Sequence, residues 1–63
     1  MVCRIVMESS LASAIAALTA AGLVVRNSQV FGPRVFVWGE ATSAQVTTIR
    51  GLPNVVGVTT VGS

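Results

Sequence analysis

Residues 34–38, Arg-Val-Phe-Val-Trp, give the clearest local indication of how this chain folds. Its alternating β-branched and aromatic side chains predict a strand in which Val35 and Val37 face one side of a sheet. The other side then carries Arg34, Phe36 and Trp38. Residues 31–34 (FGPR) predict a turn before this strand, because Gly and Pro are the strongest local turn signals.

The part of the chain before that turn predicts a strand, a helix and a second strand. Residues 2–7 (VCRIVM) and 23–30 (LVVRNSQV) are rich in β-branched side chains, which favour strands. Between them, apolar residues recur at i, i+4 and i+7, which is the spacing of one helix face. Ser9 or Ser10 is suited to cap this helix and Gly22 to end it.

The part of the chain after residue 38 repeats the helix and strand. Thr42 and Gln45 have the spacing of a capping box, in which each side chain satisfies a backbone donor at the helix start. Gly51 ends the predicted helix, and Pro53 prevents its continuation. Residues 54–61 (NVVGVTTV) then predict the last strand.

The predicted order of elements is therefore βαββαβ. Right-handed crossovers place both helices on one face of a four-stranded antiparallel sheet, which is an α+β, ferredoxin-like two-layer sandwich over the single domain 1–63. The first and third strands are central in this arrangement, and the second and fourth are edges. The predicted helix-facing set is apolar throughout: Ile5, Leu11, Ile15, Leu18, Leu23, Val25, Val35, Val37, Val46, Ile49, Leu52, Val56 and Val58.

The composition indicates a domain that packs against other chains. At 63 residues the chain is near the size at which a single core is marginally stable. Only 10% of the residues are charged, against roughly 25% in ordinary soluble domains. Because Cys3 is the single cysteine and the chain has no His and no Asp, neither a disulfide nor a metal site is expected. Oligomerisation or incorporation into a larger assembly is the remaining source of stability.

The uncharged stretch from residue 9 to 25 reaches the lower end of the length of a membrane-spanning helix. It is rich in Ala, Ser and Thr and is interrupted by Gly22, so we expect no membrane span. The N-terminus also resembles a secretory signal, but Glu8 interrupts it and cleavage would leave too little chain to fold. We therefore expect an intracellular or particle-associated protein, with a virion as one setting, that is not secreted by a cleaved signal.

The residue types predict no enzymatic activity and no cofactor. General acid–base catalysis needs a His or a tuned pair of carboxylates. The two carboxylates, Glu8 and Glu40, precede the two predicted helices, where they would complement the helix dipoles. Cys3 lies in a predicted core strand without a His to activate it, and the glycines match no phosphate-binding loop.

The sheet face turned away from the helices is the predicted binding surface. A two-layer domain of this size cannot bury Trp38 on that face without a partner, and large aromatic residues beside arginines are typical interface anchors. The alternative is that the arginines only keep a half-exposed sheet hydrated. The predicted partner-binding residues are Arg4, Val24, Arg26, Arg34, Phe36 and Trp38, with Val2 and Val6 beside them.

Residues 34–38 resemble the third strand of the RNA-recognition motif, a family with the same βαββαβ order. That family stacks bases on aromatic residues two positions apart, as Phe36 and Trp38 are here. The first predicted strand, 2–7, has no aromatic residue. The resemblance implies single-stranded nucleic-acid binding as one alternative function.

A second resemblance covers more of the chain. Leu52, Pro53, Val55 and Val58 match the Leu-Pro-x-Val-x-x-Val run that enters the last strand of the subtilisin propeptide and inhibitor family, and residues 22–25 and 30–32 are also similar. The resemblance implies the same fold. It also implies protease inhibition, in which the sheet lies against the protease and the C-terminal tail enters its substrate cleft.

We therefore expect a non-enzymatic structural subunit that packs into a homo- or hetero-oligomer through its open sheet face, its strand edges and its Ala-rich first helix. The composition suits an accessory or cement component of a virus-like or phage particle. The edges favour this assignment, since residues 23–30 and 54–61 lack Lys and only Arg26 protects them from pairing. Subtilisin-propeptide-like inhibition is the alternative, and single-stranded nucleic-acid binding is a further one.

Overall fold

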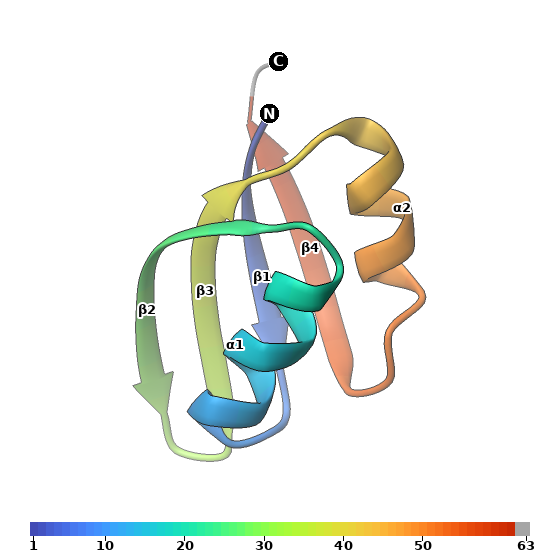
Figure 1. Ribbon diagram of the computed structural model, residues 1–63. Helices are drawn as coiled ribbons and strands as arrows, with labels where there is room; N and C mark the ends of the chain where they lie inside the picture. Colours follow the sequence, from blue (N-terminus) through green and yellow to red (C-terminus); the bar gives the residue numbers. More distant parts are fainter. Residues whose placement is uncertain (62–63) are drawn as a thin grey trace.

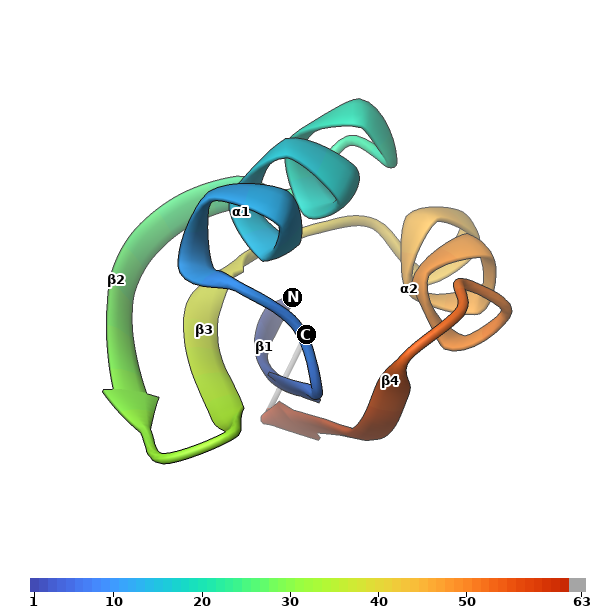
Figure 2. The same cartoon turned by 90° about the horizontal axis from the view of Figure 1, so that it is seen from below.

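The computed structural model of the protein describes residues 1–61 and has six elements in the predicted order. They are β1 (Val2–Met7), α1 (Leu11–Ala20), β2 (Val24–Phe31), β3 (Arg34–Glu40), α2 (Ser43–Arg50) and β4 (Val55–Val61). The strands form one antiparallel sheet in the order β2-β3-β1-β4 (Figure 1). Both helices cover the same side of this curved sheet (Figure 2). The predicted ferredoxin-like α+β sandwich is confirmed.

Local hydrogen bonds fix both ends of α1. Ser10 is the N-cap, and its side chain accepts a hydrogen bond of 3.2 Å from the N–H of Ser13. Gly22 follows the helix with a φ of 99°, which is in the left-handed region that favours glycine. The N–H groups of Gly22 and Leu23 donate back to carbonyls of the last turn, which is the Schellman arrangement.

The capping box at the start of α2 is also confirmed. The side chain of Thr42 accepts from the N–H of Gln45 at 3.2 Å, and Gln45 Oε1 accepts from the N–H of Thr42 at 2.8 Å. Gly51 ends the helix in the right-handed conformation, with a φ of −86°. The left-handed residue lies further on, at Asn54, whose φ is 70° and whose carbonyl accepts from the N–H of Glu8 at 2.9 Å.

The core lies between the helices and the two central strands. Val35 and Val37 are 1% and 0% exposed, so the predicted phase of β3 is confirmed. The same alternation buries Ile5 in β1, against Leu18 and Ile49 from the helices. In residues 1–61 the buried set contains no polar or charged side chain. None of the helices within that range is long and apolar enough to cross a membrane.

Leu11 and Val56 were predicted to lie in the core, and for these two residues the prediction is wrong. Leu11 is 36% exposed, because it is the first residue of α1 and the helix buries Ala14 one turn later. Val56 is 46% exposed because the pairing of β4 with β1 shifts by one residue at this point. Val55 pairs with Met7 and packs on the core in its place.

Candidate functional site

The open face, defined here as the side of the sheet opposite the helices, has its centre on β1 and β3. Arg4 pairs with Trp38 and Val6 with Phe36 in the register of these strands. Directly opposed residues of antiparallel strands project from the same face, so these four side chains form one contiguous group. Trp38 and Phe36 are half-buried, and Arg4 is exposed.

Three aromatic rings, those of Phe31, Phe36 and Trp38, form a continuous cluster on this face. The centroids of Phe31 and Phe36 are 5.3 Å apart with an edge-to-face angle of 79°. Those of Phe36 and Trp38 are 6.1 Å apart with the rings 26° from parallel. The Arg4 guanidinium carbon lies 5.9 Å from the Phe36 centroid, which is within cation–π range. These contacts orient the rings before any partner arrives.

Phe31 is a member of this cluster that the sequence analysis placed in a turn. It is the last residue of β2, and it pairs with Arg34 across the two-residue turn Gly32-Pro33. Gly32 has a φ of 57° and Pro fixes a negative φ after it, which together define a type II′ hairpin turn. The Gly-Pro pair was the sequence signal that could have placed Phe31 in the strand. A two-residue turn places its flanking residues, here Phe31 and Arg34, opposite each other.

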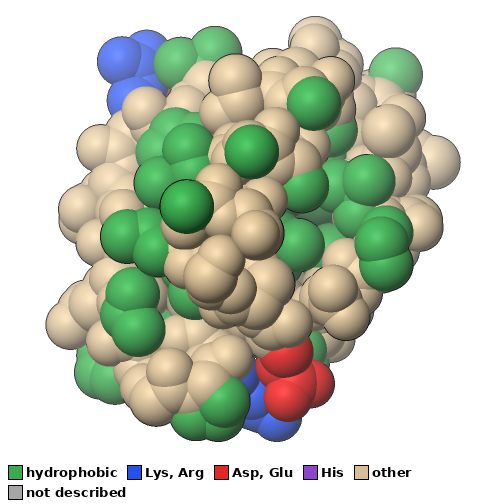
Figure 3. Space-filling view, turned by 60° about the horizontal axis from the view of Figure 1, so that its bottom comes forward, with side chains coloured by type: hydrophobic (Ala, Val, Ile, Leu, Met, Phe, Trp, Pro, Cys, Tyr) green, Lys and Arg blue, Asp and Glu red, His purple; other side chains and the backbone are tan. Residues whose placement is uncertain are grey.

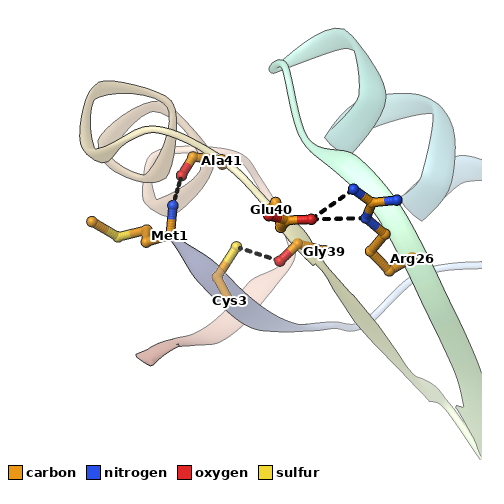
Figure 4. Close-up of polar contacts among 6 residues, drawn as sticks. All are labelled: Met1, Cys3, Arg26, Gly39, Glu40 and Ala41. Carbon is orange, nitrogen blue, oxygen red and sulfur yellow. Dashed lines mark hydrogen bonds and ion pairs between the residues drawn. The ribbon is translucent and has the colours of Figure 1, made fainter. Parts of the chain in front are cut away.

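Arg26 differs from Arg4 and Arg34 because it has an acidic partner. The pairing of β2 with β3 shifts between Val25 and Asn27, so Arg26 lies at a bulge. Its Nη2 and Nε atoms lie 2.7 Å and 2.9 Å from Glu40 Oε2 (Figure 4). Arg26 therefore neutralises Glu40.

Glu8 and Glu40 each precede a helix, as predicted, and neither lies within the first helical turn. The pair between Arg26 and Glu40 is the sole ion pair among residues 1–61. Arg4 and Arg34 are exposed, and among residues 1–61 neither has a carboxylate partner within the ion-pair distance. The open face is consequently basic, and Val24, next to Glu40 in the register, is an exposed apolar residue at its end.

Cys3 lies on the helix-facing side and is not part of this surface. Burial raises the pKa of its thiol, and this outweighs the opposite effect of the nearby amino terminus. Its Sγ lies 3.7 Å from the carbonyl oxygen of Gly39 (Figure 4). A buried, neutral thiol is a poor nucleophile. The described part of the chain also holds no pocket and no cluster of metal-ligating side chains.

The helix side of the molecule is uncharged over most of its area. Figure 3 shows hydrophobic side chains spread across it and charged ones only near its margins. Except for Ala17, which is half-buried, the small residues on the back of α1 are exposed: Ala12, Ser13, Ala16, Thr19 and Ala20.

No family model matches the chain, and neither a curated protein nor a solved structure matches it. The geometry and charge of the open face therefore carry the functional argument.

Proposed function

We propose that the protein is a non-enzymatic interaction subunit whose open face binds an acidic surface of a partner protein. The observation that carries this proposal is the cluster of Phe31, Phe36 and Trp38 with the Arg4 guanidinium over one ring. Aromatic and arginine side chains dominate the binding energy of protein interfaces. Phe31 is 54% exposed, so this cluster still has apolar surface to bury.

The charge of the open face supports an acidic partner. Arg4 and Arg34 would pair with carboxylates of the partner, since guanidinium groups bind carboxylates through two parallel hydrogen bonds. Val2 and Val24, the register neighbours of Glu40, are exposed at one end of this face and add apolar contact area. Two open faces brought together would oppose like charges, which disfavours self-association through this surface.

The size and composition of the chain support a role inside a larger assembly. A 63-residue domain has a small core and gains stability from burial against a partner. Its low charge content and the uncharged back of α1 are suited to an accessory component of a large particle, which is the setting we propose.

Trp38→Ala tests the proposal. Immobilised protein is used to isolate a partner from the source cells, and the purified partner is then titrated by calorimetry. We expect Trp38→Ala to weaken binding by about 30-fold, because truncating an interface anchor costs about 2 kcal/mol or more. Leu11→Ala is the matched control, since it truncates an exposed apolar residue of the helix layer.

An unchanged affinity for Trp38→Ala, or an equal loss for Leu11→Ala, would contradict the proposal. Titration with a single-stranded oligonucleotide tests the nucleic-acid alternative in the same way. Tight binding that weakens steeply with salt and with Trp38→Ala would show that the partner is a nucleic acid and not a protein.

Protease inhibition is the second candidate function. Val55 and Val58, two of the residues that carry the sequence resemblance to subtilisin propeptides, pack against the core. The resemblance implies that the sheet lies against the protease. Removal of residues 62 and 63, which lie outside the described residues, is expected to abolish inhibition of subtilisin. If neither the full chain nor the shortened chain inhibits subtilisin, protease inhibition is not the function.

A further inference from the structure

We propose that the outer edge of β4 pairs with β4 of a second copy of this chain, so that two four-stranded sheets join into one antiparallel sheet. This surface is separate from the open face. The two proposals therefore rest on different residues and fail independently.

The hydrogen-bond pattern of the sheet identifies the backbone groups at this edge. The amino terminus of Met1 donates to the carbonyl of Ala41 at 2.7 Å (Figure 4), and the N–H of Ala41 donates back to the carbonyl of Met1 at 3.0 Å. Bonded and non-bonded pairs alternate along an antiparallel ladder. Counting along β1 from this doubly bonded pair, the backbone groups of the odd-numbered residues bond to β3. The backbone groups of Val2, Arg4 and Val6 bond to β4.

The same alternation applies to β4. Gly57, Thr59 and Val61 are the register partners of Val6, Arg4 and Val2, so their backbone groups point toward β1. The N–H and C=O groups of Val58 and Thr60 therefore point away from the sheet. In residues 1–61, β4 has one strand neighbour, β1. These outward groups are positioned to pair with another strand.

The side chains distinguish this edge from the other one. β4 has the sequence VVGVTTV, without charge or proline and rich in β-branched residues. β2 contains Asn, Ser and Gln, and also Arg26, whose side chain is 64% exposed at the bulge. A charged residue at a bulge is a common protection of an edge strand. β4 lacks that protection beyond its first residues, where its own bulge lies.

A second copy is the occupant that the charges favour. A two-fold axis brings β4 against β4, so that Val, Thr and Gly residues oppose one another without any like-charge contact. Cross-strand pairs of β-branched residues and Thr–Thr pairs are favourable. Face-to-face association would instead bring together the Arg4 and Arg34 side chains of both copies.

α2 enlarges the contact beyond a strand pair, which alone is smaller than a stable interface. It packs against β4 at this end of the sheet (Figures 1 and 2). By helical spacing, Ser43, Thr47 and Arg50 lie on the side opposite Gln45, which contacts Gly22. The Thr47 hydroxyl already donates to the Ser43 carbonyl at 3.2 Å, so burying it leaves no unsatisfied donor. A two-fold axis places the two Arg50 side chains at opposite ends of the helix pair.

Thr60→Pro tests the proposal, because it removes an N–H that points outward and leaves the bonds to β1 intact. Val30→Pro is the matched control. Val30 is exposed on the edge strand β2, pairs with Val35 and, by the same alternation, also points its N–H outward. Sedimentation equilibrium of the full chain should show a wild-type dimer. Thr60→Pro should raise its dissociation constant by at least about tenfold, since each copy loses one intermolecular bond.

Val30→Pro should leave the dimer unchanged, and so should Trp38→Ala, which separates this proposal from the open-face function. A wild-type protein that stays monomeric up to about 1 mM would overturn the proposal. An equal weakening by Val30→Pro would overturn it as well.

Amide exchange of the wild-type chain gives a second test that needs no variant. The amides of Val58 and Thr60 should exchange more slowly as the protein concentration rises, while those of Ser28 and Val30 should not change. Concentration-independent exchange at Val58 and Thr60 overturns the proposal even where Thr60→Pro does not fold.

Discussion

At the scale of single residues, Gly22 holds two elements in place. Its positive φ ends α1, and a Cβ at this position would collide with the Gln45 side chain at the start of α2. We expect Gly22→Ala to lower the free energy of unfolding by about 1–2 kcal/mol or more, because it combines backbone strain with a steric clash. Urea unfolding followed by circular dichroism measures this loss.

Gly57→Ala is the control for that measurement. Gly57 lies in β4, and a Cβ there would meet no atom within 4 Å. Its replacement should change the free energy of unfolding by no more than about 1 kcal/mol. Equal losses for the two variants would show that the conformation of Gly22 does not matter.

At the scale of elements, the strands and helices were predictable because each has a local signal. Alternation marked β1 and β3, and the capping residues marked the start of both helices. The bulge at Arg26 was not predictable, because a bulge depends on the pairing of a strand with its neighbour. The bulge at Val56 has a local signal in the adjacent Gly57, because glycine inside a strand often marks a bulge. One extra residue in a strand turns every following side chain to the opposite face of the sheet.

The candidate site shows the same division. Arg4, Phe36 and Trp38 lie on central strands with regular pairing and were placed on the correct face. The side chain of Arg26 and the place of Phe31 both depend on β2, whose register shifts at the bulge. Side-chain alternation therefore located the centre of the open face but missed Phe31 on its β2 side.

The ladder of β4 gives a prediction at this scale. Thr59 and Thr60 are neighbours, but only the N–H of Thr59 points toward β1. Thr59→Pro should lower the free energy of unfolding by about 1–3 kcal/mol, because it leaves a carbonyl of β1 without its donor. Thr60→Pro should cost less than about 1 kcal/mol when both are measured by urea unfolding of dilute protein. The opposite order would mean that the alternation is assigned the wrong way round.

At the scale of the whole molecule, the chain has few groups that titrate. It contains no His, Lys or Tyr, so Cys3 is the one side chain expected to ionise between about pH 7 and pH 11. Burial raises the pKa of this thiol above its ordinary value of 9.0, so the folded state holds its proton more tightly than the unfolded state. Stability should be constant with respect to this group below pH 9 and should fall as the pH rises above it.

Unfolding in urea at a series of pH values up to 11 measures this dependence. Cys3→Ala should remove the alkaline fall in stability. A variant that keeps the full slope would show that the thiol is not its source.

The position of β1 has a consequence for how the protein is made. β1 is synthesised before its two neighbours, β3 and β4, and the second of these is the last element of the sheet. A nascent chain therefore leaves the ribosome with its central strand open on both sides, and the sheet closes only when the final strand has emerged. Chaperones that shield uncharged β-strands during this interval should raise the yield of correctly folded protein.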